Sequence, residues 1–254
     1  MSFFFALNLN NFNNLITIPK FTNEGIKLKG ISLFSAKIKK DKWQIKKQVC
    51  REDDYFFYLE VLPKDLEDIF FLNNSSFCNS NKGLLVKELK IFYDVKSNYT
   101  FRANLKIKND KYGSSSYQSE YPIEMTYKKG SILSTVSSLI NEENSNFIAF
   151  KQIYYLPTKK PFQVFLVDLK KEKILSKTIF YSNSTNIIEL SKVKDIKNCC
   201  FYSDGFLGIP VFISYGNKGV SMEHSHPPHL YIQSNNKFEL VTNLKNKVKK
   251  IVSK

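Results

Sequence analysis

Apolar and polar residues alternate along much of the chain, which is typical of strands with one face on a core and one in water. The clearest example runs from residue 99 to residue 107. Its alternate positions form one apolar set, Phe101, Ala103, Leu105 and Ile107, and one polar set, Arg102, Asn104, Lys106 and Lys108. Similar runs predict further strands at residues 15–18, 26–38, 55–61, 85–93, 123–127, 147–155, 162–169, 174–181, 199–202 and 211–215.

Two segments instead place apolar residues at helical spacing. In residues 131–140 the apolar stripe consists of Ile132, Val136, Leu139 and Ile140. In residues 238–252 it consists of Val241, Leu244, Val248 and Ile251, with lysines around the other faces. We expect the second helix to pack this stripe on the sheet. The alternative is a weak peripheral contact of its lysines with an anionic membrane or a partner.

The predicted fold is mainly β: an antiparallel β-sandwich or jelly-roll-like barrel, with one short inserted helix and a C-terminal amphipathic helix. The 22 phenylalanines and 14 tyrosines favour it, because aromatic side chains suit half-buried pleated surfaces. A polar stretch at residues 73–82 indicates a boundary between an N-terminal β region, residues 1–80, and a main sandwich, residues 81–254, that includes the helix at 238–252. The N-terminal region could belong to the same sheet system, and a single compact domain is the alternative.

The formal charge of +15 raises the question of polyanionic partners. Of the 38 basic residues only Arg51 and Arg102 are arginine, the side chain best suited to bidentate phosphate and guanine recognition. A lysine-rich chain of this kind is expected to carry solvated lysine faces and to bind polyanions non-specifically. Specific nucleic-acid binding is therefore disfavoured.

Cysteine usage and the apolar segments bear on the compartment. The four cysteines, Cys50, Cys78, Cys199 and Cys200, show no Cys-x-x-Cys spacing, which favours reduced thiols. Residues 1–15 lack a basic start and a small-residue cleavage site, and no run approaches the length of a membrane span. We expect a soluble, cytoplasmic protein.

All three histidines lie between positions 224 and 229. His224 and His226 would project to one face of a strand, and Pro227 and Pro228 stiffen the segment that leads to His229. Imidazole ligands suit transition metals, so the cluster predicts a metal site with zinc or iron as cofactor. The alternative is a surface loop whose histidines bind no metal.

The pair His224-x-His226 is similar in part to the first metal motif of cupins. Cupins place a glutamate a few residues after the pair, where this chain has Leu230 and Tyr231, and they supply a later histidine that this chain lacks. The partial similarity implies, as an alternative function, a metal-dependent enzyme of a cupin-like kind. In that enzyme metal-bound water or substrate would be activated at the cluster, with Glu223 as general base.

A second set of residues points to a different ligand. Arg102, beside Asn104 in mid-strand, is suited to hold a carboxylate or phosphate bidentately. Residues 112–121 form a predicted polar loop rich in hydroxyls, amide and rings, the mix that sugar recognition needs. The alternative is a solvent-facing arginine paired with a nearby glutamate. The predicted ligand-binding residues are Arg102, Asn104, Tyr117, Gln118 and Glu120.

Three functions stay open from these observations. The first is a β-sandwich binding or accessory protein that holds a transition metal, a carbohydrate or an anionic small ligand. The second is the metal-dependent enzyme, and the third is a structural or interaction protein with incidental histidines. The chain has no glycine-rich phosphate loop, Gly-x-Ser-x-Gly elbow or paired-cysteine zinc module.

Overall fold

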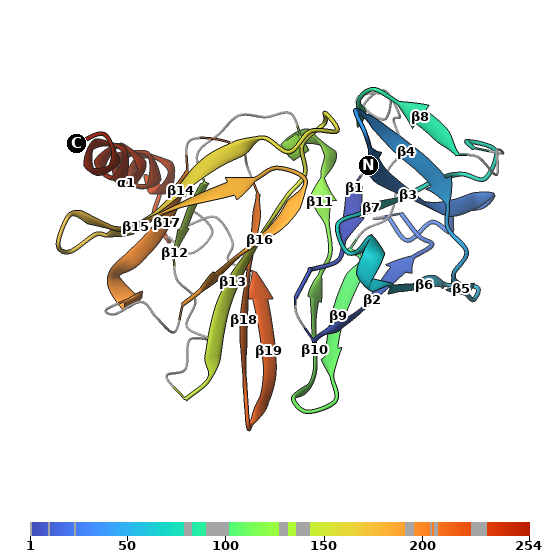
Figure 1. Ribbon diagram of the computed structural model, residues 1–254, viewed down its shortest axis with the longest axis horizontal. Helices are drawn as coiled ribbons and strands as arrows, with labels where there is room; N and C mark the ends of the chain where they lie inside the picture. Colours follow the sequence, from blue (N-terminus) through green and yellow to red (C-terminus); the bar gives the residue numbers. More distant parts are fainter. Residues whose placement is uncertain are drawn as a thin grey trace. The chain divides into compact units, whose positions relative to one another are not determined.

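The chain folds mainly into antiparallel β-strands and ends in one α-helix, as the sequence predicts (Figure 1). This computed structural model describes residues 2–9, 11–22, 24–78, 83–89, 102–126, 132–135, 143–190, 196–203, 205, 208–224 and 233–254; for residues 132–135, 197 and 224 only the backbone is described. The chain divides into two units. Unit 1 comprises Met1–Tyr127, Ile153–Lys159 and Asn183–Thr185, and unit 2 comprises Lys128–Gln152, Lys160–Ser182 and Asn186–Lys254.

In its described residues, unit 1 holds two antiparallel sheets. A six-stranded sheet has the order β11-β1-β7-β3-β4-β8, and a five-stranded sheet has the order β10-β9-β2-β6-β5. The strands are β1 (Ser2–Phe5), β2 (Asn13–Pro19), β3 (Ile31–Lys39), β4 (Lys42–Lys47), β5 (Arg51–Glu52), β6 (Phe56–Val61), β7 (Ile69–Asn74), β8 (Leu84–Val86), β9 (Asn104–Asn109), β10 (Gly113–Gln118) and β11 (Tyr121–Pro122). Two short 3₁₀ helices, η1 (Pro63–Asp65) and η3 (Ile123–Thr126), belong to the same unit.

Aromatic residues of β3 and β7 build part of the unit 1 core. The buried rings of Phe34 and Phe71 stack with centroids 5.8 Å apart, and Phe77 meets Phe34 edge-on at 5.6 Å. Trp43 on β4 is buried, and its indole N–H donates a hydrogen bond to the carbonyl of Tyr155 at 3.0 Å. The indole is thus buried without losing its polar partner.

Unit 2 contains two four-stranded antiparallel sheets, of order β12-β17-β14-β15 and β16-β13-β18-β19, and the helix α1. β16 starts at Ser184, in the short segment assigned to unit 1, and continues into unit 2. The elements are β12 (Ile132–Thr135), β13 (Ser145–Gln152), β14 (Pro161–Asp168), β15 (Lys173–Tyr181), β16 (Ser184–Glu189), η4 (Ile196–Asn198), β17 (Cys199–Ser203), β18 (Ile209–Gly216), β19 (Gly219–His224) and α1 (Lys237–Val252).

The two sheets of unit 2 form a sandwich with a helix on its outer face. Phe150 of β13 and Phe212 of β18 share one buried cluster with Leu166 of β14 and Phe201 of β17. Because side chains alternate between the two faces of a strand, β14 and β17 also place a second set of apolar residues on the opposite face of their sheet, where these residues pack against α1. That second cluster consists of Phe165, Val167, Cys200, Tyr202, Val248 and Ile251.

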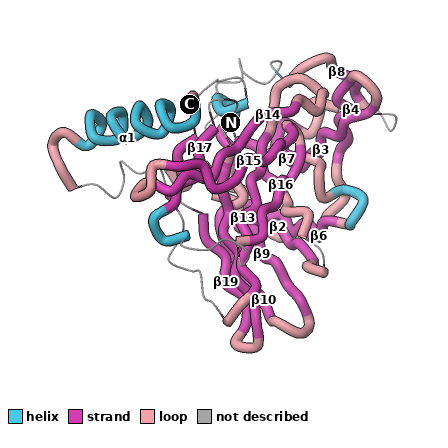
Figure 2. The backbone as a smooth tube through the Cα atoms, turned by 60° about the vertical axis from the view of Figure 1, so that its left-hand side comes forward, coloured by secondary structure: helices cyan, strands magenta, loops and turns pink. Residues whose placement is uncertain are grey.

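The C-terminal helix confirms the sequence prediction closely. It spans Lys237–Val252 and buries Val241, Val248 and Ile251, while Leu244 is partly buried against the same cluster. Figure 2 shows it as the long cyan helix, and its contacts are with β14 and β15. In the described part of the chain no helix has the length and apolar character needed to cross a membrane.

Three sequence predictions about local structure are wrong. Ile132–Thr135 is the strand β12, paired with Cys200–Ser203 of β17, and not the start of a helix at 131–140, whose remainder lies outside the described residues. Ile123–Thr126 is the 3₁₀ helix η3 and not a strand. The predicted polar loop at 112–121 is largely the strand β10. The boundary predicted at residues 73–82 can be compared with the two units. Asn73 and Leu84, which lie on either side of it, both belong to unit 1.

Candidate ligand-binding surface

One row of opposed residues crosses all five strands of the β10-β9-β2-β6-β5 sheet. Gln118 lies opposite Asn104, Asn104 opposite Thr17, Thr17 opposite Tyr58, and Tyr58 opposite Arg51. Directly opposed residues of antiparallel strands project to the same face. With strands about 4.8 Å apart, this transverse row spans roughly 19 Å. The strands that carry it are labelled in Figure 1.

The transverse row lies on the solvent face of the sheet. The neighbouring positions Ile16, Leu59 and Leu105 are buried, whereas Asn104 and Arg51 are exposed and Thr17, Tyr58 and Gln118 are half-buried. On β9 this burial confirms the predicted division into an apolar and a polar face. The sheet therefore presents amides, a hydroxyl, a phenol ring and a guanidinium side by side.

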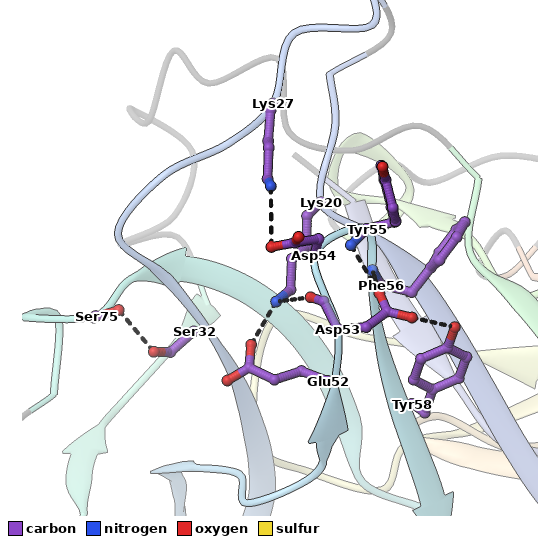
Figure 3. Close-up of polar contacts among 10 residues, drawn as sticks. All are labelled: Lys20, Lys27, Ser32, Glu52, Asp53, Asp54, Tyr55, Phe56, Tyr58 and Ser75. Carbon is purple, nitrogen blue, oxygen red and sulfur yellow. Dashed lines mark hydrogen bonds and ion pairs between the residues drawn. The ribbon is translucent and has the colours of Figure 1, made fainter.

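The side chain of Tyr58 contacts three neighbours, of which Asp53 and Phe56 are drawn in Figure 3. Its hydroxyl donates a hydrogen bond to Oδ2 of Asp53 at 2.8 Å, and the Arg51 guanidinium lies 4.2 Å from its ring centroid. Phe56, two residues earlier on the same face of β6, has its ring 6.1 Å from that of Tyr58. The surface thus includes an aromatic pair whose orientation is fixed by its neighbours.

Asp53 organises the turn that leads into β6 (Figure 3). Its Oδ1 accepts hydrogen bonds from the backbone N–H groups of Tyr55 and Phe56, both at 2.7 Å. These two backbone donors, followed by the Tyr58 hydroxyl, lower the pKa of Asp53. The hydrogen bond to Asp53 raises the pKa of Tyr58 in turn. Asp53 is therefore an anchor that stays ionised while Tyr58 stays protonated.

Lys20 contacts the residues at the start of this turn. The Nζ of Lys20 donates to Oε2 of Glu52 at 2.5 Å and to the carbonyl of Asp53 at 2.6 Å, and lies 4.4 Å from the ring centroid of Phe57. The Lys20 side chain is only 13% exposed, so this contact fixes β5 against β2 more firmly than a freely solvated pair would. The short edge strand that carries Arg51 is held by these contacts.

The structure brings together some of the predicted ligand-binding residues. Asn104 and Gln118 are opposed on the transverse row, and Arg102 is exposed just before β9. Tyr117 lies opposite the buried Leu105 and therefore projects to the other face of the sheet. Glu120 follows β10, and its Oε1 accepts a hydrogen bond from Ser2 Oγ at 2.6 Å.

The predicted metal cluster falls mostly outside the described residues. His224 ends β19 opposite Val211, but its side chain is not described, and His226 and His229 lie outside the described part. Glu223, the predicted general base, is half-buried on β19 opposite Phe212. Among the described residues no group of three or more His, Cys, Asp or Glu side chains could hold a metal ion.

Sequence reasoning missed Phe56 and Tyr58 as parts of the surface. The run at 55–61 is so apolar that it predicts a strand buried on both faces. Glu60 was the available signal, because a charged residue at i+2 from Tyr58 marks the face that the tyrosine shares with solvent. The contribution of Arg51 had no such signal, since it depends on the register between β5 and the neighbouring strand β6, which sets Arg51 opposite Tyr58.

Comparison with known proteins supplies no relative. No protein-family model, curated protein or solved structure matches the chain.

Proposed function

We propose that the chain is a binding or accessory protein, and that the solvent face of its five-stranded sheet in unit 1 binds a carbohydrate. The observation that supports this is the transverse row, which sets Gln118, Asn104, Thr17, Tyr58 and Arg51 in register. The ligand would lie flat on this solvent face of the sheet.

Each chemical group on this face has a use in sugar recognition. The amides of Asn104 and Gln118 and the hydroxyl of Thr17 offer both donors and acceptors to sugar hydroxyls. Phe56 and Tyr58 present apolar ring surface beside them, on which the C–H face of a pyranose can pack. Arg51 adds a bidentate donor suited to a carboxylate or sulfate substituent.

The surface is also organised before a ligand arrives. Tyr58 is fixed by Asp53 and Arg51, and Asn104 and Gln118 project from paired strands, not from a free loop. Side chains held by their neighbours lose less conformational entropy on binding, which favours affinity at a shallow site. This supports a binding role more than a catalytic one for the described residues.

Binding to a panel of immobilised neutral and acidic oligosaccharides tests the proposal. We expect the wild-type chain to retain at least one oligosaccharide, and the double variant Asn104→Ala/Gln118→Ala to lose it by about tenfold or more. The matched control, Asn243→Ala/Asn246→Ala, removes two amides from α1 and should bind as the wild type does. Equal binding by the two double variants, or no binding by the wild type, would overturn the proposal.

A further inference from the structure

The solvent-facing side of β9 carries a line of cations. Arg102, Asn104, Lys106 and Lys108 are all exposed, and the residues between them, Ala103, Leu105 and Ile107, are buried. Alternate residues of a strand lie about 7 Å apart, so Lys106 and Lys108 have this spacing on β9, and Arg102 lies just before the strand begins. This cationic line, Arg102–Asn104–Lys106–Lys108, runs along the strand and crosses the transverse row at Asn104.

The strands on either side add no charge to this line. Ser116 and Ser114 of β10 lie opposite Lys106 and Lys108, and Leu15 and Asn13 of β2 lie opposite the same two lysines. Hydroxyl or amide side chains therefore flank Lys108 on both sides and Lys106 on its β10 side, and Leu15 lies on the β2 side of Lys106. A ligand could reach the ammonium groups and hydrogen-bond to the flanking residues together.

The described acidic residues near Lys106 and Lys108 leave the charge of these two lysines largely in place. Asp110 lies 3.6 Å from the Nζ of Lys108, but both side chains are largely exposed, at 94% and 61%, so the pair is weak. Glu60 shares the row of Lys106 two strands away, beyond Leu15. Glu120 accepts a hydrogen bond from Ser2.

We propose that the ligand of this face is a linear acidic polysaccharide, with its carboxylate or sulfate groups along the cationic line of β9. The inference rests on the proposed function and names its ligand class. Charge complementarity supports it, because the line is cationic and the whole chain carries a formal charge of +15. The flanking serines and asparagine match the hydroxyls of a sugar chain.

The same line fits a nucleic acid less well. Single-stranded nucleic acids bind through aromatic rings on which bases stack. The solvent-facing residues of β9 and β10 are Asn104, Lys106, Lys108, Ser114, Ser116 and Gln118, none of them aromatic. The rings of Phe56 and Tyr58 lie two strands away on β6. Lysine ammonium groups also match spaced carboxylates or sulfates without requiring bidentate geometry.

Calorimetric titration of the full chain tests the inference with four probes: a polygalacturonate hexamer, a heparin hexasaccharide, chitohexaose and oligo(dT). At low salt we expect one or both acidic sugars to bind at least tenfold more tightly than chitohexaose and oligo(dT). The variant Lys106→Gln/Lys108→Gln should weaken that binding about tenfold. The matched control Lys249→Gln/Lys250→Gln on α1, which removes the same charge, should leave it unchanged. Binding of polygalacturonate would show that carboxylates suffice, and binding of heparin without binding of polygalacturonate would show that sulfates are required, because heparin carries both groups.

The outcomes separate this inference from the proposed function. Suppose that Asn104→Ala/Gln118→Ala loses binding while Lys106→Gln/Lys108→Gln binds fully. The proposal of an acidic polysaccharide would then be wrong, and the proposal of a carbohydrate-binding surface would stand. Tighter binding of oligo(dT), lost in the lysine variant, would replace the polysaccharide with a nucleic acid. If the lysine variants of β9 and α1 weakened binding of the acidic sugars equally, the binding would depend only on the total charge of the chain. That result would overturn the inference.

Discussion

The hydroxyl of Tyr58 donates a hydrogen bond to the carboxylate of Asp53, with 2.8 Å between Oη and Oδ2. This contact joins the turn before β6 to the aromatic part of the proposed binding surface. The other carboxylate oxygen already accepts the N–H groups of Tyr55 and Phe56, so one side chain fixes both the turn and the ring. The orientation of Tyr58 toward solvent therefore depends on Asp53.

A first prediction concerns the ionisation of Tyr58. Because its hydroxyl donates to Asp53, the pKa of Tyr58 is raised above the ordinary value of 10.0. In Asp53→Asn the pKa of Tyr58 should fall toward that value, as followed by NMR of the ring, with assignment from Tyr58→Phe. Asp54→Asn, next in sequence, removes a carboxylate that pairs with Lys27 at 3.4 Å and should leave the Tyr58 pKa unchanged. The same shift in both variants would contradict the contact.

The carboxylate itself gives a prediction for acid stability. The folded state lowers the pKa of Asp53, mainly through the backbone donors of Tyr55 and Phe56. Its stabilising contribution is therefore fully present above the unfolded pKa of about 3.9 and is lost as the pH falls through the lower folded value. Wild type should unfold at higher urea than Asp53→Asn at neutral pH, and the difference should shrink at acid pH. A constant difference would contradict this reasoning.

The cysteines are expected to differ in reactivity. Burial, and then the neighbouring Cys199, raise the pKa of Cys200 to about 12, whereas Cys50 is half-buried and its pKa is raised by burial and by Glu52. Thiol reagents react with the thiolate, so the cysteine that is least buried and can be reached by the reagent should react first. Treatment of the native chain with a thiol reagent at pH 8, followed by peptide mass mapping, should label Cys50 before Cys78, Cys199 and Cys200. Rapid native labelling of Cys200 would contradict the packing of β17.

Packing of α1 on unit 2 can be measured with one residue. Val248 is fully buried in the cluster with Phe165, Val167 and Cys200. Val248→Ala should destabilise the chain by about 2 kcal/mol in urea unfolding followed by circular dichroism at 222 nm. Leu240→Ala, at a helix position that is 42% exposed, should change stability by less than about 0.5 kcal/mol. Equal effects of the two changes would mean that the helix does not pack through Val248.

The histidine cluster still predicts a transition metal. Protein purified without a tag should contain about one equivalent of zinc or iron by elemental analysis. The variant His224→Ala/His226→Ala/His229→Ala should lose this metal and melt at a lower temperature. Metal well below one equivalent in the wild type, with an unchanged melting temperature in the variant, would show that the histidines are not a metal site.

Local pattern predicted those parts of the fold in which burial alternates along a single strand or helix. It placed Ala103, Leu105 and Ile107 on the buried face of β9, and Val248 and Ile251 on the buried face of α1. It failed for β10 and β12. The Gly-Ser sequence of Gly113–Gln118 has low strand propensity, and β10 forms because β9 offers a complete partner. Ile132–Thr135 similarly pairs with β17.

The transverse row was only half predictable for a related reason. Asn104 and Gln118 are close in sequence and were grouped by composition. Their alignment with Thr17, Tyr58 and Arg51 depends on the register between strands that are far apart in the chain. Register is set by which faces become buried when the sheet assembles, and a single sequence does not state it.

The most direct test of the proposed binding face is amide chemical-shift mapping of the full chain with the oligosaccharide that binds best. The account predicts that the largest shifts occur on the solvent face of this sheet, at Gln118, Asn104, Thr17 and Tyr58 of the transverse row and at Lys106 and Lys108 of β9, with smaller shifts on α1. Shifts confined to residues of unit 2, or shifts spread evenly over exposed lysines, would contradict it.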